Sequence, residues 1–429
     1  MAASVSPRAS DRSGPSVAIV GAGIGGLAAA LAISRAGLRV TVFEQARQFQ
    51  NVGGGIQLAA NGSRIAYRWG LADALAQCAA QPEGFEVRAA DGEVLTRLAF
   101  GATYVNDYGS PHLTMHRAQL HQVLLDQLPP GTVRLGHRLT ELTWGDEGPV
   151  RLEFDGPGTE TAGTVVEADV VIGADGMHSV VRGRVAAALT PDDQTPQQSP
   201  PQYSGYVAYR GIAPAEAVSS LSPDTMYLWT GTTGRLLCYP IDCGRSFTTV
   251  LLELEPEGAP ESWSASGSAE QLAAAMSVYG DVAAAQLTAG TQQIRRWALY
   301  DRDPLDIWSS GPVTLLGDAA HPMLPHRGQG ASQALEDAVV LSHCLAQAGD
   351  DPKELVTALA RYEAIRSPHT AVIQTGARGR GSLRIGVQPE PSEAGPDPDA
   401  AAAASSAVST LTRDADYFRR YDVAAELDG

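Results

Sequence analysis

The hexapeptide GAGIGG at residues 21–26 constrains the fold of this chain more than any other feature. It follows the β-branched run 16–20 and leads into the alanine-rich stretch 26–36, whose composition favours a helix. A second strand, RVTVF at 39–43, comes next and ends at Glu44. The order strand, glycine turn, helix, strand predicts a βαβ unit in which the two strands lie parallel in one sheet.

Three of these glycines, Gly21, Gly23 and Gly26, have the spacing GxGxxG. In a dinucleotide-binding turn the first glycine allows a tight bend, the second lets the backbone approach a pyrophosphate, and the third lets the helix pack closely on the strand. The phosphates then lie at the positive N-terminus of the helix. Glu44 can accept a hydrogen bond from a ribose 2′-hydroxyl and would repel the extra phosphate of NADP, so the fixed dinucleotide is FAD or NAD. The alternative is a glycine-rich turn without a ligand.

Charge and hydropathy exclude several classes of protein. The formal net charge of -17 and the pI near 4.9 leave no basic surface for nucleic acid or an anionic membrane. The apolar run 17–33 resembles a signal peptide or a short membrane span, but its glycines have the better use given above. We therefore expect a cytoplasmic protein. The four cysteines form no CxxC pair and suggest neither a metal site nor a disulfide framework; they are Cys78, Cys238, Cys243 and Cys344.

The pattern of the chain changes near residue 200. A proline-rich loop at 190–202 is typical of a domain boundary, and the strand-like segments beyond it come close together, which predicts an antiparallel sheet. A leucine-rich strand signal returns at 312–316, and a helix is expected to begin near Gly330. The sequence thus predicts a discontinuous α/β domain with a β-rich domain inserted. The strand-like segments are 206–212, 225–230, 235–241 and 247–255.

Three motifs in this order resemble a known family. GAGIGG with Glu44 is followed by VIGADGMHSVVR at 171–182 and by GDAAHPMLPHRGQGASQALEDA at 317–338. Together they resemble the para-hydroxybenzoate hydroxylase class of FAD-dependent monooxygenases, and within it the salicylate hydroxylase-like aromatic hydroxylases are the most similar. The resemblance covers residues 17–386.

The resemblance implies an α/β fold: a Rossmann-type FAD-binding domain of the GR2 type with an inserted, mostly antiparallel β-sheet substrate domain. It also gives the chain an expected division. We expect a disordered lead at 1–15, the first part of the FAD-binding domain at 16–200, the substrate domain at 203–300, the second part of the FAD-binding domain with its helices at 312–386, and a flexible linker with the C-terminal segment at 387–429, of which 388–405 is of low complexity.

The resemblance also implies the residues that hold FAD. Those matching the ADP half are Gly21, Gly23, Gly26 and Glu44, and those matching the flavin half or the DG segment are Arg117, Asp175, Gly176, Asp318, Gly328, Gly330 and Ala331. Physical chemistry supports the assignment of Gly328, Gly330 and Ala331, because backbone N–H groups at a helix N-terminus stabilise negative charge on a reduced flavin ring.

His326 is the candidate catalytic residue. A histidine can orient or deprotonate a phenol and so raise the electron density of its ring. The alternative is a structural histidine bonded to a backbone carbonyl. For His321 we expect a structural role. Because side chains alternate along a strand, Tyr206 and Arg210 share one face and Tyr209 takes the other. The candidate substrate-binding residues are Tyr206, Tyr209, Arg210, Arg235 and Tyr239, although either arginine could instead be a solvated outward charge.

The resemblance implies a complete reaction cycle. NADH or NADPH binds transiently and reduces tightly bound FAD, the reduced flavin captures O2 as a C4a-hydroperoxide, and one oxygen is transferred to an activated phenolic or hydroxy-heteroaromatic ring. The partner is thus a small aromatic substrate, and the protein is a monomer or a homodimer. Three alternatives stay open: a related hydroxylase or epoxidase of a larger natural product, a non-catalytic FAD-fold binding protein, and a flavin oxidase or dehydrogenase.

Overall fold

The computed structural model describes most of the chain. The expected linker at 388–405 and most of the expected lead at 1–15 lie outside the described residues. The described ranges are 14–50, 53–145, 148–155, 163–190, 200–231, 234–255, 268–378 and 415–427.

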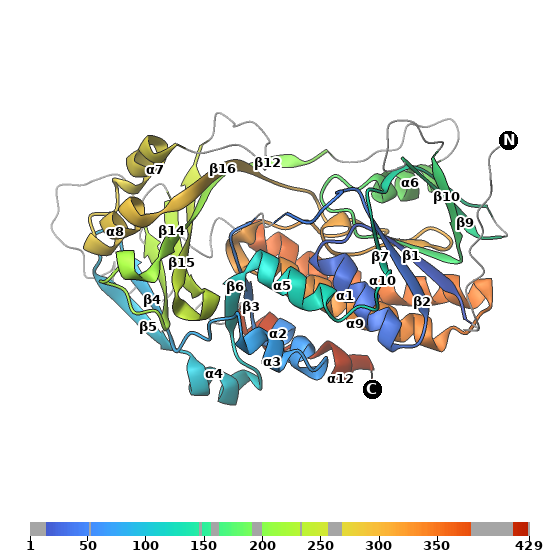
Figure 1. Cartoon of the computed structure of the whole chain (residues 1–429), viewed down its shortest axis with the longest axis horizontal. Coiled ribbons are helices and arrows are strands. Elements are labelled where there is room, and N and C mark those ends of the chain that lie inside the picture. The colour runs from blue at the N-terminus through green and yellow to red at the C-terminus, as the bar shows by residue number, and fades with distance from the viewer. Residues whose placement is uncertain are drawn as a thin grey trace.

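A five-stranded parallel sheet forms the centre of the half at the right of Figure 1. Its central strand β1 (Ser16–Val20) pairs in parallel with β2 (Arg39–Glu44) and with β11 (Val170–Gly173), which confirms the predicted βαβ unit. All four residues of β11 are buried, as in sheets covered on both faces. The outer strands are β17 (Val313–Leu315) and β7 (Val133–Leu135).

Helices and a small second sheet cover this parallel sheet. The helix α1 (Ile24–Arg35) packs against α9 (Gly330–Gln347), which in turn packs against α10 (Pro352–Arg378). Phe43 of β2 stacks on Phe154 of a three-stranded antiparallel sheet, with ring centroids 4.5 Å apart. That sheet consists of β8 (Arg138–Thr143), β9 (Val150–Asp155) and β10 (Thr164–Ala168).

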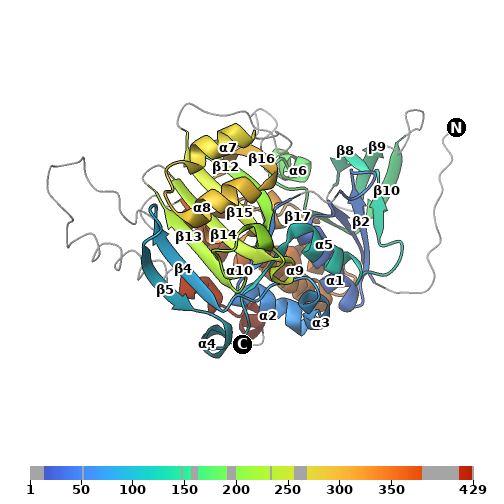
Figure 2. The same cartoon turned by 60° about the vertical axis from the view of Figure 1, so that its left-hand side comes forward.

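The other half is built on a seven-stranded sheet with the order β16-β12-β15-β14-β13-β4-β5. Its pairs are antiparallel except β13 with β4, and the four strands predicted beyond residue 200 are all present. The helices α7 (Ala269–Met276) and α8 (Val282–Gly290) lie across one face (Figure 2). The strands are β4 (Gly84–Ala89), β5 (Val94–Ala99), β12 (Gln202–Pro214), β13 (Thr225–Thr230), β14 (Gly234–Ile241), β15 (Ser246–Leu254) and β16 (Gln292–Asp301).

One expected boundary needs correction, and the C-terminal segment needs a fuller description. The strands β4 and β5 lie in the stretch 16–200, which was assigned to the FAD-binding domain, yet they extend the substrate sheet because β4 pairs with β13. At the other end, residues 415–427 form the expected C-terminal segment, and they are packed on the body of the protein. Phe418 and Val423 are buried, and Arg68 forms two hydrogen bonds with Asp422 at 2.6 and 2.7 Å. The predicted fold class itself is confirmed.

Shorter elements join the two halves. The helix α5 (Arg117–Leu125) packs on α1, and the strands β3 (Gly55–Leu58) and β6 (Leu113–His116) form an antiparallel pair. The remaining helices are α2 (Ala60–Arg68), α3 (Ala72–Ala76), α4 (Gly101–Tyr108), α6 (Val180–Ala188) and α12 (Val423–Leu427).

The apolar run 17–33 forms strand, glycine turn and helix, and not a membrane span. Of the helices in the described ranges, none combines the length and the apolarity that a bilayer crossing needs. A cytoplasmic location stays a prediction.

Candidate active site

The glycine turn has the shape that the sequence predicts. Gly21 has φ +102, and a Cβ on it would lie 2.5 Å from the carbonyl oxygen of Ala174. A Cβ on Gly26 would lie 2.0 Å from the carbonyl oxygen of Gly21. Both glycines are therefore required by the packing of the strand and the helix. At Gly23, by contrast, a Cβ would meet no atom within 4 Å, so the turn faces open space there.

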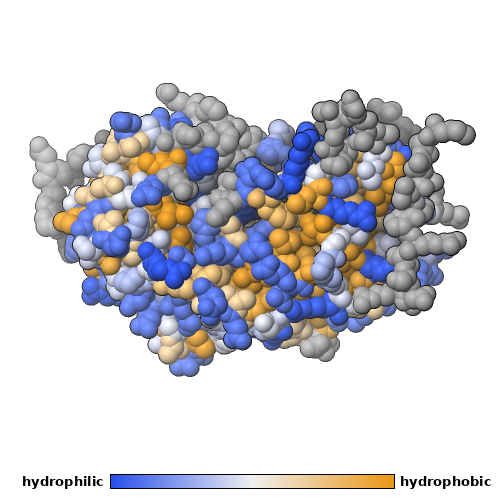
Figure 3. All heavy atoms as spheres, viewed as in Figure 1, coloured by the Kyte–Doolittle hydropathy of each residue, from blue (hydrophilic) through white to orange (hydrophobic). Residues whose placement is uncertain are grey.

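The N-terminus of α1 at this open space has the features of an anion site. Gly23 is its N-cap residue and supplies no side chain to bond the free N–H groups. Glu44 lies beside the turn, where its carboxylate accepts hydrogen bonds from the N–H groups of Ala22 (2.9 Å) and Ala46 (2.8 Å). Figure 3 shows apolar residues at the surface around α1 and α5. These features fit the ADP half of FAD.

The flavin-side residues also lie together. Burial among protein atoms raises the pKa of Asp318, yet its side chain keeps contact with solvent, as expected for a carboxylate on the wall of a recess. Arg117 is near enough to offset part of this rise. The helix α9 begins without a side-chain cap, and a Cβ on Gly330 would meet no atom within 4 Å. Gly328 just before it has φ +61. The recess and the uncapped helix fit the flavin half of FAD.

The DG segment has a structural task that the sequence does not reveal. The carboxylate of Asp175 accepts hydrogen bonds from the Ser179 hydroxyl and from the N–H of Val180, at 2.5 and 2.7 Å, and so fixes the start of α6. Gly176 takes the positive φ of +78 that this turn needs. Arg182 donates to the carbonyl oxygen of Ala319 at 2.8 Å. The segment thus holds the turn that carries Asp318, and direct contacts of Asp175 with FAD stay a prediction.

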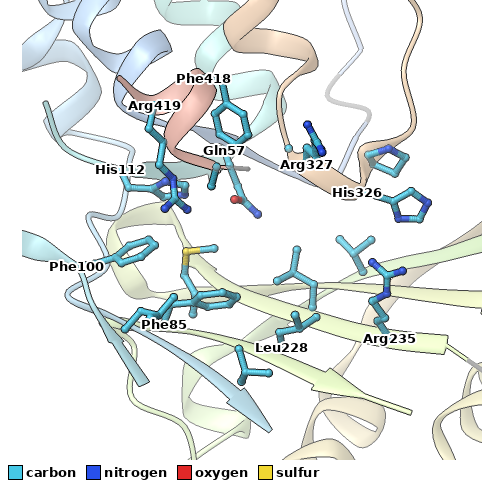
Figure 4. Close-up of a pocket in the computed structure, with 18 of the residues that line it drawn as sticks. Gln57, Phe85, Phe100, His112, Leu228, Arg235, His326, Arg327, Phe418 and Arg419 are labelled. Carbon is cyan, nitrogen blue, oxygen red and sulfur yellow. The ribbon is translucent and has the colours of Figure 1, made fainter. Parts of the chain in front are cut away.

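A cavity of about 180 Å³ lies between the seven-stranded sheet, the loop at 325–328 and the segment 415–419 (Figure 4). Its wall on the sheet side is apolar, with Phe85, Met226 and Leu228 among the lining residues. It touches the loop before α9, so it adjoins the flavin-side recess. A cavity of about 150 Å³ suffices for benzene, so this one has room for a single substituted ring.

His326 and Arg235 form one polar end of this cavity (Figure 4). Burial, and to a smaller extent the positive charge of Arg235, lowers the pKa of His326 to about 4. Its Nδ1 is buried and has no hydrogen-bond partner, and its ring lies edge-on to Tyr206 with centroids 5.7 Å apart. Within the described ranges Arg235 has no carboxylate partner. A neutral histidine can accept the proton of a phenol, and an unpaired guanidinium beside it can stabilise the phenolate that results.

Arg210 and Tyr239 form a separate cluster outside this cavity, against the turn before β3. A Cβ on Gly54 would lie 3.2 Å from the Arg210 side chain, and one on Gly55 would lie 2.8 Å from the Tyr239 hydroxyl. The Arg210 guanidinium lies over the Trp297 ring at 5.1 Å, and burial lowers its pKa. Burial also raises the pKa of Tyr239 to about 12. We therefore propose that Arg210 and Tyr239 lie on the flavin side of the site.

The prediction that Tyr209 binds substrate is wrong. Its side chain points to the opposite face of the sheet, where it packs in the core beneath α7 and α8 and accepts a hydrogen bond from Arg296 at 3.0 Å. Strand alternation explains this placement, because Tyr206 and Arg210 point to the other face, where Tyr206 lies beside His326 and Arg210 lies over Trp297. His321 is structural as expected, since it is buried with its Nε2 2.6 Å from Asp337.

Sequence reasoning missed four polar residues of the cavity: Gln57, His112, Arg327 and Arg419. Arg327 had no expected role. The structure shows that it lines the cavity while its guanidinium packs on α10, where a Cβ on Gly376 would lie 2.3 Å from it. Arg327 belongs to the motif at 317–338, and Arg419 to the aromatic ending DYFRRYD, whereas Gln57 and His112 belong to none of the motifs named above. Each reaches the cavity only through tertiary packing.

A dinucleotide cradle, a flavin-side recess and a ring-sized cavity beside it define a flavoprotein monooxygenase that acts on an aromatic ring. The chain belongs to the FAD binding domain family, whose model matches residues 15–376. Its relatives are aromatic-ring monooxygenases, so the protein is an FAD-dependent aromatic hydroxylase and not a non-catalytic FAD-fold protein.

Three similar proteins illustrate the family. A 3-amino-4-hydroxybenzoate 2-monooxygenase of Streptomyces platensis is 40% identical over 86% of this chain and 88% of its own. A 6-hydroxynicotinate 3-monooxygenase of Bordetella bronchiseptica is 34% identical over 88% of this chain and 94% of its own. The solved structure of a salicylate hydroxylase substrate complex has a TM-score of 0.78, with 26% identity over 97% of this chain and 98% of its own.

Replacing Gly23 by alanine tests the cradle. The new methyl group meets no protein atom, so we expect folding to be unchanged. It would occupy the space of the pyrophosphate and weaken FAD binding by about 10- to 100-fold, as an added methyl does at a tightly packed contact. Titration of apoprotein with FAD, followed by flavin fluorescence, measures this. Gly26→Ala is the contrasting variant, because its methyl collides with the protein itself and should lower the thermal stability too. Unchanged FAD affinity in Gly23→Ala would contradict the assignment.

Proposed function

We propose that the protein hydroxylates a single-ring aromatic acid that carries a ring hydroxyl, with NADH or NADPH and O2 as co-substrates. The observation that carries this proposal is the cavity of about 180 Å³, with His326 and the unpaired Arg235 at one end and an apolar wall on the side of the sheet. Its size favours one substituted ring over a larger natural product. The names of the relatives agree, because 3-amino-4-hydroxybenzoate, 6-hydroxynicotinate and 3-hydroxybenzoate all join a ring hydroxyl to a carboxyl group.

Among these compounds 3-amino-4-hydroxybenzoate is our first choice. The relative named for it shares 40% identity with this chain, against 34% and 30% for the relatives named for 6-hydroxynicotinate and 3-hydroxybenzoate. Salicylate has the weaker support of a structure at 26% identity. A cytoplasmic monomer or homodimer is part of the same proposal.

In the proposed mechanism the protein prepares the ring for oxygen transfer. FAD, when bound by the cradle and recess, supplies the reduced ring system that reacts with O2. His326 accepts the phenolic proton at its free nitrogen, and Arg235 stabilises the phenolate that forms. The apolar wall around Phe85 and Leu228 excludes water from the reacting ring. The uncapped N-terminus of α9 stabilises negative charge on the flavin side.

The direct test is substrate-stimulated oxidation of NADH and NADPH by the FAD-loaded enzyme, with product mass recorded. We expect 3-amino-4-hydroxybenzoate to stimulate oxidation and to gain one oxygen. Loss of CO2 in the same product would show a decarboxylating hydroxylation. No stimulation by any hydroxybenzoate or hydroxynicotinate, together with turnover of a multi-ring phenol, would overturn the proposal. Reduction of FAD by the substrate alone would instead indicate an oxidase or dehydrogenase.

A further inference from the structure

The cavity has a second polar end that the proposed mechanism does not use. Figure 4 shows Arg419 and His112 on the side opposite to Arg235 and His326, with apolar residues such as Phe85 and Leu228 between the two ends. We call Arg419 and His112 the distal pair. A ring bound in the cavity therefore has polar protein groups at both of its ends.

Both members of the distal pair have buried nitrogen atoms without a hydrogen-bond partner, although the Arg419 side chain also bonds the Tyr108 hydroxyl. His112 is only 6% exposed, and both its ring nitrogens lack a hydrogen-bond partner. Burial, followed by the charge of Arg419, lowers the pKa of His112 to about 3, so its ring is neutral and one nitrogen is a free donor. Arg419 Nε is also buried without a partner, and no carboxylate in the described ranges pairs with Arg419. Unsatisfied buried donors beside a cavity indicate a missing acceptor.

The surroundings hold Arg419 in place without neutralising it. Its guanidinium lies over the rings of Phe100, Tyr104 and Tyr108, at 5.8, 5.4 and 5.5 Å. These cation–π contacts fix its position and leave its charge available to an anion.

The C-terminal segment that carries Arg419 is itself tied to the body of the protein. Arg64 of α2 donates to the carbonyl oxygen of Tyr421 at 2.9 Å, and Tyr108 of α4 donates to Asp416 at 2.5 Å. Because these contacts anchor one residue before and one residue after Arg419 in the sequence, Arg419 is a built-in part of the cavity wall. The segment 415–419 thus contributes side chains to the wall of the cavity.

We propose that Arg419 and His112 hold the carboxylate of the substrate, while its hydroxyl lies at the opposite end with His326 and Arg235. This inference rests on the proposed function and deepens it, because it selects rings whose carboxyl and hydroxyl groups are opposite each other. 3-Amino-4-hydroxybenzoate has that arrangement, whereas salicylate has the two groups on adjacent carbons. Arg419 is therefore a specificity-determining residue supplied by the C-terminal segment.

The test compares 3-amino-4-hydroxybenzoate with 2-aminophenol, the same ring without the carboxylate. Binding to the FAD-loaded enzyme is measured without NAD(P)H, through the change in flavin absorbance. In Arg419→Met, which keeps most of the side-chain length, affinity for the acid is expected to fall about 10- to 100-fold, the effect of losing hydrogen bonds to a charged group. Affinity for 2-aminophenol should stay within about twofold. The matched control is Arg420→Met, because Arg420 is the exposed neighbour that bonds the carbonyl oxygen of Asp107.

The outcomes separate the inference from the proposed function. If the wild-type enzyme binds neither compound, the proposed function fails. If it prefers the acid and Arg419→Met keeps that preference, or if only Arg235→Met abolishes it, the function stands and the distal pair is overturned. Should Arg419→Met lose stability, His112→Phe serves as a second variant. It should weaken acid binding about 3- to 10-fold and leave 2-aminophenol unchanged, and an unaltered preference there also overturns the inference.

Discussion

Replacing Arg366 by leucine is expected to destabilise the protein by about 3–5 kcal/mol, because two buried carboxylates then lose the guanidinium that they share. Arg366 is fully buried in α10 and donates to Glu336 and to Asp337, each at 2.8 Å. The matched control is Arg361→Leu on the same helix, where the exposed guanidinium bonds Gln347 and the cost should stay within about 0.5 kcal/mol. Urea unfolding at a fixed FAD concentration measures both variants, and equal stabilities would contradict the prediction.

The stability deficit of Arg366→Leu should also widen as the pH rises above 7. Burial raises the pKa of Glu336 to about 7, and Arg366 is the main group that opposes this rise. In the unfolded chain a glutamate has a pKa of about 4.3, so between these values the folded state holds the extra proton and stability falls as pH rises. In the wild type this fall in stability ends near pH 7. Without Arg366 the pKa of Glu336 is higher, so stability continues to fall above pH 7. Unfolding at pH 6 and pH 8.5 checks this, and a constant deficit would argue against it.

The Arg366 network supports the active site as well as the fold. Asp337 accepts a hydrogen bond from the N–H of Gly317, next to Asp318, at 3.0 Å. Asn61 of α2 donates to Glu336 and also to Gln329 at the start of α9. Arg366 therefore holds both ends of the loop that runs from the flavin-side recess to the cavity. We expect weaker FAD binding in Arg366→Leu for this reason.

The sequence predicted the parts of the site that local geometry determines. Gly21 and Gly26 are readable because a tight turn and a close helix contact require glycine wherever this turn occurs. The four strands beyond residue 200 are readable from their composition, and strand alternation correctly placed Tyr206 opposite to Tyr209. The sequence did not reveal which face of the seven-stranded sheet meets the cavity, because that depends on the face on which α7 and α8 pack.

The residues that the sequence did not reveal reach the site through distant segments. β4 joins the substrate sheet by pairing with β13 across more than a hundred residues, and it brings Phe85 into the cavity. Arg419 comes from a short helical stretch for which the sequence predicted only a C-terminal segment after the linker. Its position depends on docking contacts with α2 and α4, and no pattern within the segment records such contacts.

Replacing His326 by leucine is expected to lower kcat for the hydroxylated product about 10²- to 10⁴-fold, the usual contribution of a general base. The leucine fills a similar volume, so FAD content should be unchanged. His343→Leu is the matched control, because that histidine lies on α9 and contacts only Gln347 among the hydrogen bonds described. Product formed per NAD(P)H consumed is the measurement. A loss of less than about tenfold would fall below the range for general-base catalysis and assign His326 a structural role.

The pH dependence of kcat/KM distinguishes a base from a residue that only shapes the cavity. Burial and Arg235 lower the pKa of His326 to about 4, so the neutral, proton-accepting form predominates above that pH. The wild type should therefore lose activity only as pH falls through about 4. In Arg235→Met the positive neighbour is gone, so the pKa of His326 rises toward its ordinary value and the acidic limb moves to higher pH. Between pH 5 and pH 8 the variant should gain activity with pH while the wild type stays level. If the pH profiles of the wild type and Arg235→Met were parallel, a group other than His326 would accept the phenolic proton.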